Sequence, residues 1–368
     1  MKIIFIATRS IEKIGGIETY MAKLAPKLAE KNHNIVLYCL GDSNNMKLWK
    51  NITIQQIKGK DGKFTGKIKL GLRATLHAMR HHNDADIFHY HAMGSGLSSI
   101  IPIILRKKVI FQGHGFEWQR TKWNKLSRFI IKSLDSFVLK INKNIVMVSQ
   151  NQSDYVSAKF HKPVHTITPG IDIPESLTFN DGVLKRFSLE ENEYFLFLGR
   201  LVQEKRADIL IKSFINSNIT NKKLVIAGDD PYEKKYIESL KKLALNNKNI
   251  IFTGSVFGIE KENLLAKCFA FCIPSELEGL PITLLEAMSY KKYCIASNIL
   301  ACKEALGQNG VFFKVNDIDE LIKKLQNLCN NQTSYKDIGN NNYLRVKKIF
   351  TWDKIADHYE KYCLKLIK

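Results

Sequence analysis

The sequence lacks the features of a secreted, disulfide-bonded or membrane-spanning chain. Its seven cysteines include no C-x-x-C pair and no His/Cys spacing typical of a metal site. The N-terminal residues MKIIFIATRS hold too short an apolar run for a signal peptide, and no apolar run approaches the ~18 residues of a membrane span. We therefore expect a cytoplasmic protein with reduced thiols, which can still lie peripherally on the inner face of the cell membrane.

The sequence is also short of acidic residues. It has 56 Lys and Arg against 35 Asp and Glu, a formal net charge of +21. Such an excess indicates an anionic partner, which is nucleic acid, a membrane surface or a phosphorylated substrate. No recognition helix, zinc site or aromatic RNA motif supports nucleic acid, so we expect none. Only Glu117 and Asp135 oppose the ten cations of one basic region, namely Arg106, Lys107, Lys108, Arg120, Lys122, Lys125, Arg128, Lys132, Lys140 and Lys143.

The first glycine pair, Gly15-Gly16, does not form a G-x-G-x-x-G dinucleotide fingerprint. It does lie between an apolar run at 2–8 and a helical pattern at 17–31, and another apolar run follows at 35–40. Strand, glycine loop, helix and strand form a βαβ pattern, which predicts a parallel sheet with helices on both faces. The pair is therefore either part of a ligand-binding loop or a plain tight turn.

The alternation of strands and helices occurs twice in the 368 residues, which are too many for a single typical core. It is interrupted over residues 174–193 and restarts with the apolar run at 194–198. We predict an α/β fold of two doubly wound, Rossmann-like domains facing across a cleft, with the ligand outside the carboxyl ends of the strands. The expected domains are residues 1–172 and 173–350, and an amphipathic helix at 351–368 is expected to pack back on the first domain.

The stretch PSELEGLPITLLEAMSY, residues 274–290, carries two carboxylates eight residues apart, Glu278 and Glu286. Gly279 and Pro281 between them predict a loop that leads into the N-terminus of a helix. The free N–H groups and the dipole of such a helix end suit a phosphate-bearing ligand. The alternative is that the carboxylates only stabilise the helix dipole.

Several apolar strands of the second half end in glycine. Gly199 and Arg200 follow FLFL, Gly228 follows VIA and Gly254 follows IIFT. Arg200 and Lys205 flank one loop, where together they can neutralise a diphosphate. Two surface cations in a basic protein are the alternative. Anion-binding groups beside the carboxylate of Glu286 fit a nucleoside diphosphate, with Glu286 accepting hydrogen bonds from the ribose hydroxyls.

These residues, in this order and spacing, resemble the retaining GT-B glycosyltransferases of family four. The resemblance covers nearly the whole chain. It includes Gly199-Arg200…Lys205, FTGSV around Gly254 and above all the two glutamates within PSxxEGLPxxLLEAM. The segments FHYHAMGSGL and HGFEWQRTKWN resemble rhamnosyltransferase-like enzymes of bacterial surface polysaccharide assembly. One departure is Arg206, where the family usually has glycine.

The resemblance implies a role for each matching residue. Arg200 and Lys205 would hold the donor diphosphate, Glu278 the hydroxyls of the donor sugar and Glu286 the ribose. His114, beside the transferred sugar, would complete a catalytic set with Arg200, Lys205 and Glu278. The other expected donor-binding residues are Gly16, Gly199, Gly228, Gly254, Ser255, Val256, Gly279, Leu280 and Pro281, and the expected acceptor-binding residues are Gly15, Glu117, Trp118 and Arg120.

Two of these interpretations have structural alternatives. A satisfied histidine of the core is the alternative for His114, and His89 and His91 are interpreted as structural. Glu117, Trp118, Arg120, Lys122 and Trp123 combine aromatic rings with cations, which suits a sugar or a pyrophosphate-lipid headgroup. A solvated, basic start of a helix is the alternative for this segment.

The function expected from the resemblance is metal-independent, retaining transfer of a hexose-type sugar from a nucleoside-diphosphate sugar to a saccharide acceptor, linked to a lipid carrier. Electrostatic stabilisation of the leaving diphosphate would be the main catalytic effect. Retention is usually ascribed in this family to front-face attack, so neither a protein nucleophile nor a cofactor is expected. The alternatives are a nucleotide-sugar epimerase of similar fold, which would convert the donor without an acceptor, and a sugar-nucleotide-binding protein that never turns it over.

Overall fold

The computed structural model describes residues 1–8, 15–59, 64–120, 123–174, 181–330 and 335–368. Within these residues the chain divides into two compact units. Unit 1 comprises Met1–Gly170 and Trp352–Lys368, and unit 2 comprises Ile171–Thr351. The chain therefore leaves unit 1 after Gly170 and returns to it at Trp352.

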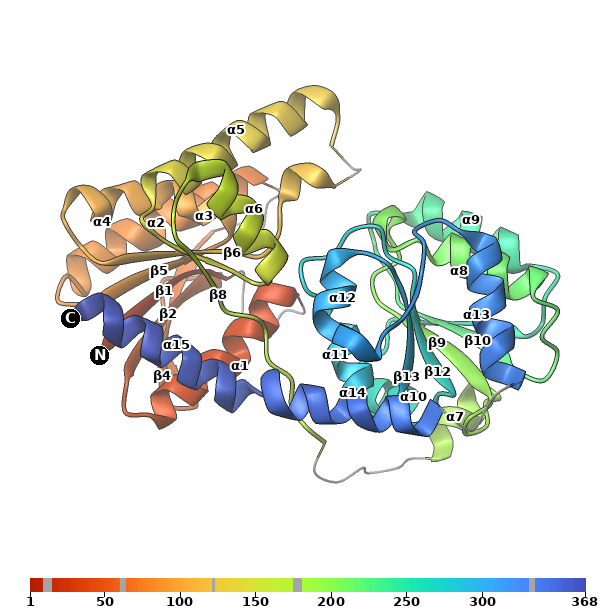
Figure 1. Cartoon of the computed structure of the whole chain (residues 1–368). Coiled ribbons are helices and arrows are strands. Elements are labelled where there is room, and N and C mark those ends of the chain that lie inside the picture. The colour runs from red at the N-terminus through yellow and green to blue at the C-terminus, as the bar shows by residue number, and fades with distance from the viewer. Residues whose placement is uncertain (9–14, 60–63, 121–122, 175–180, 331–334) are drawn as a thin grey trace. The chain divides into compact units, whose positions relative to one another are not determined.

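The described part of unit 1 contains one eight-stranded sheet, which is parallel except where β3 pairs with β4 (Figure 1). Short apolar runs such as KIIFIAT form its inner strands, as expected for strands covered on both faces. In spatial order the strands are β3 (Met46–Trp49), β4 (Ile52–Lys58), β2 (Asn34–Gly41), β1 (Lys2–Thr8), β5 (Ile87–His91), β6 (Val109–Gly113), β7 (Asn144–Met147) and β8 (Val164–Thr166).

Helices cover both faces of this sheet. Ile3 and Phe5 of β1 pack with α1 (Gly16–Glu30) and α15 (Trp352–Ile367), whereas Ile4 and Ile6 pack on the opposite face (Figure 1). The period of two in a strand directs alternate side chains to opposite faces. The helices of the second face are α2 (Phe64–His81), α3 (Ala92–Gly96), α4 (Ile100–Ile104), α5 (Lys125–Ile141) and α6 (Gln150–Phe160), with the short 3-10 turns η1 (Leu97–Ser99) and η2 (Glu117–Gln119).

The described part of unit 2 contains one six-stranded parallel sheet. Its spatial order is β11 (Ile250–Gly254), β10 (Lys223–Ala227), β9 (Tyr194–Leu198), β12 (Ala270–Ile273), β13 (Tyr293–Ser297) and β14 (Val311–Phe313). The helices are α7 (Asp181–Arg186), α8 (Ala207–Asn216), α9 (Lys234–Ala244), α10 (Gly258–Lys267), α11 (Ile282–Ser289), α12 (Leu300–Leu306), α13 (Ile318–Asn330) and α14 (Tyr335–Ile349), with 3-10 turns η3 (Gln203–Lys205) and η4 (Gly307–Asn309).

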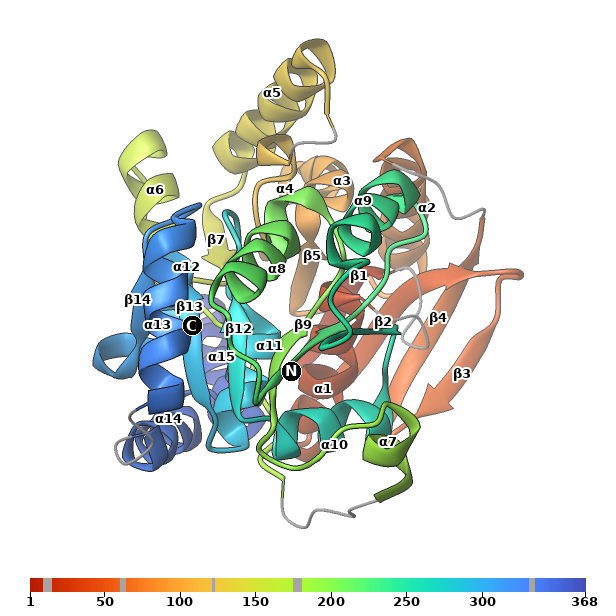
Figure 2. The same ribbon diagram turned by 90° about the vertical axis from the view of Figure 1, so that its right-hand side faces the viewer.

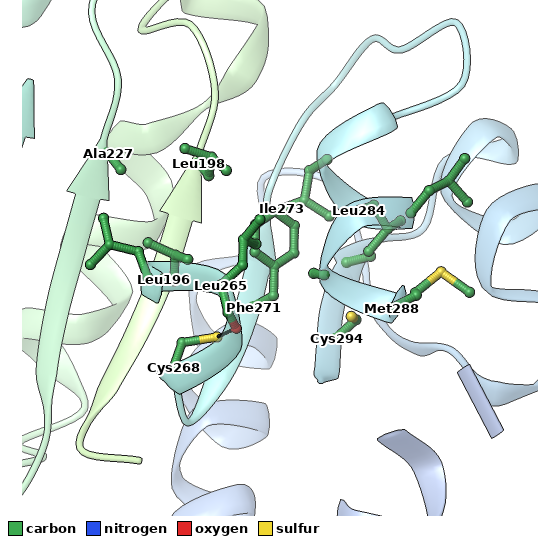
Figure 3. Close-up of a cluster of buried hydrophobic side chains, with 14 of the residues drawn as sticks. Leu196, Leu198, Ala227, Leu265, Cys268, Phe271, Ile273, Leu284, Met288 and Cys294 are labelled. Carbon is green, nitrogen blue, oxygen red and sulfur yellow. Dashed lines mark hydrogen bonds between the residues drawn. The ribbon is translucent and has the colours of Figure 1, made fainter. Parts of the chain in front are cut away.

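Figure 2 shows α8, α9 and α13 of unit 2 from the side. They share one apolar cluster with Phe195 and Phe197 of β9. On the other face, Leu196 and Leu198 belong to one buried apolar cluster with Phe271 and with Leu284 of α11 (Figure 3). Helix α11 is therefore anchored by buried apolar contacts beneath the carboxyl ends of the strands. The prediction of an α/β fold with two doubly wound, Rossmann-like sheets is confirmed.

No helix of the described residues combines the length and the apolar character needed to cross a bilayer. Residues 92–104 do not form one continuous helix. They consist of α3, η1 and α4 in succession. Pro102 and Gly96 account for the interruption, because proline removes a helical N–H and glycine weakens a helix interior.

Candidate functional site

The strand-end glycines of unit 2 lie together at one edge of its sheet. The Gly199 N–H donates to the Ala227 carbonyl at 3.0 Å, and the Gly228 N–H donates to the Gly254 carbonyl at 2.8 Å. Gly228 has φ +149°, and a Cβ atom at this position would lie 1.8 Å from the Gly199 carbonyl oxygen. Only glycine allows this approach of the two backbones. The residues predicted at the ends of β9, β10 and β11 are thus in direct backbone contact.

Arg200 extends from this edge with its side chain 52% exposed. Its Nη1 lies 3.3 Å from Oδ2 of Asp230, whose side chain is only 6% exposed. Asp230 was not predicted from the sequence, although it stands two residues after Gly228. The buried carboxylate holds one side of the guanidinium, while the exposed side remains accessible to an anion.

Lys205 and Glu278, predicted separately, form one ion pair. The Lys205 Nζ lies 2.5 Å from Glu278 Oε1, and the same oxygen accepts a hydrogen bond from Ser275 Oγ at 2.7 Å. The Glu278 side chain is 7% exposed and that of Lys205 20%. Breaking such a shielded pair on one side leaves an uncompensated charge. The pair therefore fixes both charged groups beside the loop that leads into α11.

The surroundings of Arg206 show how arginine fits at a position where the family usually has glycine. It has φ +51°, the left-handed region that glycine adopts without strain, and it stands immediately before α8. Its side chain donates to Asp208 at 3.1 Å and to Glu276. The Glu276 N–H donates to the Glu204 carbonyl at 2.9 Å. These bonds join the loop after β9 to the loop after β12, so the arginine keeps the glycine-type backbone and adds a tether between two parts of the site.

Glu286 stands in the first turns of α11, as expected, and contacts a residue that was not predicted from the sequence. Its Oε1 lies 2.8 Å from Nζ of Lys261 on α10. The side chains are 21% and 31% exposed, respectively. No spacing rule connects two residues on different helices, so the pair could not be found without the fold. Lys261 is the group that any ligand of Glu286 must share or displace.

The remaining donor-binding predictions for unit 2 lie around α11 and the end of β11. Ser255 is exposed, whereas the side chains of Val256 and Leu280 belong to the apolar core, which leaves their backbone groups for a ligand. Gly279 is half-buried. Pro281 is the N-cap and the helix starts at Ile282, one residue later than a proline at the first helical position would imply. Proline has no capping side chain, so the N–H groups of the first turn have no N-cap side chain to accept from them.

In unit 1, His114 follows β6 and contacts His91 at the end of β5. The His114 Nε2 and His91 Nδ1 lie 2.9 Å apart, and the Tyr20 ring packs edge-on against His114 at 5.4 Å. Burial lowers the pKa of His114 to about 3. Burial, with His89 and His114 nearby, lowers the pKa of His91 well below its usual range. Both rings are therefore neutral near pH 7.

The bond between the two rings indicates which nitrogen of His114 carries the proton. Among the described residues, His91 Nε2 is buried and has no hydrogen-bond partner. An orphaned buried N–H is rarer than an unfilled acceptor, which favours the tautomer with the His91 proton on Nδ1. His91 then donates to His114 Nε2, and His114 presents an N–H at Nδ1. His91 was interpreted from the sequence as structural; the structure makes it the residue that orients His114.

The acceptor-binding predictions, together with Gly16 of the donor-binding set, lie in two places of unit 1. Gly15 is the extended N-cap of α1 and Gly16 its first residue; a Cβ on Gly15 would meet Glu18, whereas one on Gly16 would meet nothing within 4 Å. At η2, Arg120 Nε lies 3.4 Å from Glu117 Oε2. The Trp118 ring is partly buried on the core and has Lys132 Nζ 4.9 Å from its centroid. Lys122 lies outside the described residues.

No group of three or more His, Cys, Asp or Glu side chains within the described ranges is arranged to hold a metal ion. The cysteines of these ranges are free thiols, and burial raises the pKa of Cys268 to about 11.

Two models of glycosyltransferase families match the chain. The family model for glycosyl transferases group 1 matches residues 184–345, and the model for glycosyltransferase family 4 matches residues 14–175. The two models together account for most of the chain. The protein belongs to glycosyltransferase family 4, and it is a glycosyltransferase.

Relatives of known activity are similar at modest identity. The UDP-Gal:alpha-D-GlcNAc-diphosphoundecaprenol alpha-1,3-galactosyltransferase of Escherichia coli is 26% identical over 74% of this chain and 75% of its own length. The GalNAc-alpha-(1->4)-GalNAc-alpha-(1->3)-diNAcBac-PP-undecaprenol alpha-1,4-N-acetyl-D-galactosaminyltransferase of Campylobacter jejuni is 29% identical over 51% of this chain. The match spans 52% of that enzyme, so the chain aligns with about half the length of this relative.

Solved structures match over nearly the whole chain. Sucrose-phosphate synthase from Thermosynechococcus elongatus superposes with a TM-score of 0.84 at 16% identity, covering 99% of this chain and 98% of that one. Anabaena Alr3699/HepE in complex with UDP gives a TM-score of 0.79 at 16% identity, covering 99% and 100%. The likeness establishes the fold as that of GT-B glycosyltransferases.

Proposed function

We propose that this glycosyltransferase moves a sugar from a nucleoside-diphosphate sugar to a saccharide acceptor, with retention of anomeric configuration and without a metal ion. The acceptor is a lipid-linked saccharide of bacterial surface polysaccharide assembly. Unit 2 holds the donor and unit 1 the acceptor. The observation that carries the proposal is the charged edge of unit 2. Arg200 and the Lys205–Glu278 pair lie on the loops that follow β9 and β12, and Gly228 after β10 approaches the Gly199 backbone as only glycine can.

The charges at this edge suit the chemistry of a diphosphate leaving group. Transfer passes through an oxocarbenium-like state in which negative charge accumulates on the departing phosphate. Fixed cations and N–H dipoles stabilise that charge without reorganising, which makes them the principal catalytic groups. Arg200 offers an exposed planar fork, Lys205 a point charge held in place by Glu278, and α11 the N–H groups of its first turn.

The lipid-linked acceptor rests on the relatives and on charge. The names of the Escherichia coli and Campylobacter jejuni relatives both specify undecaprenol-diphosphate-linked acceptors. The basic region at 106–143 of unit 1 suits a diphosphate-lipid headgroup and an anionic membrane surface. On this proposal the enzyme acts at the inner face of the cell membrane, as a peripheral protein.

The direct test is donor turnover. The purified protein is incubated with a panel of nucleotide sugars and a polyprenyl-diphosphate-linked saccharide, and release of nucleoside diphosphate is followed. Release that requires the acceptor supports transfer, and NMR of the product gives the anomeric configuration. Full activity in EDTA is expected. Inversion at the anomeric carbon, or activity restored only by a divalent cation, would contradict the corresponding part of the proposal.

The ribose role of Glu286 is tested against its ion-pair partner. Glu286→Ala removes the acceptor of the ribose hydroxyls and is expected to raise the donor dissociation constant by about 10-fold to 100-fold, the loss of one to two charge-assisted hydrogen bonds. Lys261→Ala breaks the same 2.8 Å pair but leaves the carboxylate. It is the matched control and should have a much smaller effect. Equal effects of the two variants would mean that only the ion pair matters.

A further inference from the structure

The outer face of α5 in unit 1 is apolar and exposed, which is unusual for a helix that is already anchored by its inner face. Leu126, Phe129, Ile130 and Phe137 are 70%, 69%, 49% and 43% exposed. Their spacing, together with Ser133, follows the helical period, so they form one stripe along the helix. We call these four side chains the outer stripe. The inner face is separate and consists of buried Ile131, Val138 and Leu139.

The helix that carries the outer stripe is well formed. Asn124 caps it by accepting from the Ser127 N–H at 2.8 Å. Figures 1 and 2 both show α5 at the margin of unit 1, with its N-terminal half extending beyond the neighbouring helices of that unit. The stripe is thus presented on a rigid element and not on a loop.

The charges beside the outer stripe are all of one sign. Lys125, Arg128, Lys132 and Lys140 are exposed on the same helix. Asp135, the single acid of α5, is 1% exposed and faces inward. In the part of the chain that the structure describes, no carboxylate pairs with these four cations. An apolar stripe beside cations that have no carboxylate partner matches an anionic surface with an apolar interior.

The polar side chains near the stripe are already satisfied. Ser133 Oγ donates to the Phe129 carbonyl at 3.0 Å, and Ser136 Oγ donates to the Lys132 carbonyl at 2.8 Å. A hydroxyl bonded to its own helix can enter an apolar medium without losing a partner. The long stems of Lys and Arg can keep their charges at the level of lipid headgroups while apolar side chains beside them enter the acyl region.

We infer that the outer stripe of α5 inserts into the headgroup–acyl boundary of an anionic bilayer, with Lys125, Arg128, Lys132 and Lys140 contacting lipid phosphates. The helix lies in the plane of the interface and does not span it. This inference deepens the proposed function, since it rests on a lipid-linked acceptor and names the surface by which the enzyme reaches it. A second copy of this chain or another protein is the competing occupant and is decided by the experiment.

The test compares wild-type protein with three variants in flotation assays on vesicles of phosphatidylcholine, with and without phosphatidylglycerol, at low and high salt. Leu126→Ser/Phe129→Ser removes two side chains that are 70% and 69% exposed. Leu245→Ser/Leu344→Ser, in unit 2, removes side chains that are 79% and 59% exposed and is the matched control. Circular dichroism checks that each variant is folded.

The expected result is that wild type and the control bind phosphatidylglycerol vesicles, whereas Leu126→Ser/Phe129→Ser binds at least about tenfold more weakly. Arg128→Gln/Lys132→Gln should bind these vesicles at least about tenfold more weakly than wild type at low salt. Its binding should also lose most of its dependence on salt. Equal binding of wild type and Leu126→Ser/Phe129→Ser would overturn the inference. So would a change of oligomeric state in light scattering without any change in vesicle binding.

Failure of this inference and failure of the proposed function are distinguishable. Transfer to a short-chain acceptor in detergent needs no bilayer, so Leu126→Ser/Phe129→Ser should keep wild-type turnover in detergent and lose activity only on vesicles. A protein that binds vesicles through the stripe but turns over no donor would contradict the proposed function alone. A protein that is active in detergent and indifferent to phosphatidylglycerol would contradict this inference alone.

Discussion

The close approach of two backbones at the sheet edge of unit 2 allows a prediction about stability. Alanine substitutions at three glycines should change the free energy of unfolding by different amounts. Gly228→Ala places a Cβ 1.8 Å from the Gly199 carbonyl oxygen, at φ +149°. A clash with a backbone atom cannot be relieved by a change of rotamer, so the strands must separate. The positive φ costs about 1–3 kcal/mol and the overpacking about 1–3 kcal/mol more, which makes roughly 2–6 kcal/mol in total.

Two other glycines separate the causes of this loss. Gly254 has φ +72°, and a Cβ there would meet nothing within 4 Å, so Gly254→Ala should cost only the conformational term of about 1–2 kcal/mol. Gly16 is the first residue of α1, and a methyl group added there would also meet nothing within 4 Å. Gly16→Ala should be neutral or stabilise unit 1 by up to about 1 kcal/mol.

Thermal unfolding followed by far-UV circular dichroism measures the series. A change of 1 kcal/mol shifts the Tm of a domain of this size by about 2–4 °C, so Gly228→Ala should lower it by roughly 5–20 °C. All four tryptophans, Trp49, Trp118, Trp123 and Trp352, belong to unit 1, so fluorescence reports on unit 1 while circular dichroism reports on both. If Gly228→Ala and Gly254→Ala have the same Tm, the steric explanation is refuted.

Three further predictions concern buried polar groups. Burial raises the pKa of Asp135 to about 7, so ionisation of this carboxyl lowers the free energy of unfolding of unit 1 as the pH rises from ~4 to ~7. Asp135→Asn should remove that loss. In urea unfolding the variant should gain up to about 4 kcal/mol at pH 8 and little at pH 4. Tyr359→Phe loses the 2.7 Å bond to His89 and should cost about 1–2 kcal/mol in the same assay. Glu278→Ala leaves the Lys205 charge without its partner and should lower the free energy of unfolding by about 3 kcal/mol, more than Lys205→Ala does. The double variant should lose less than the sum of the two single losses.

Patterns of local sequence were sufficient to predict the fold and the strand-end glycines. The apolar runs of β1, β9 and β10 are continuous because both faces of each sheet are covered, and such runs are readable without a structure. The short strands β3 and β4 were missed, since MKLW and ITIQQIK mix polar and apolar residues. The burial of Ile52, Ile54 and Ile57 of β4 became visible only with its partner in place.

Partners distant in sequence were beyond prediction. Glu286 and Lys261 lie on separate helices, and His91 meets His114 only because β5 and β6 are neighbours in the sheet. Arg206 is a different case, because its departure from glycine was visible but its compensation was not. The tether to Glu276 depends on two loops that the fold brings together.

The return of α15 to unit 1 has a consequence for synthesis on the ribosome. Ile355 and Tyr359 complete an apolar cluster with Phe5 and Leu24, and Tyr359 supplies the buried partner of His89. Unit 2 is one continuous stretch of polypeptide and can fold as it emerges. Unit 1 is made first but cannot close its core until residues 352–368 have been synthesised, so its exposed apolar face must survive the translation of about half the chain.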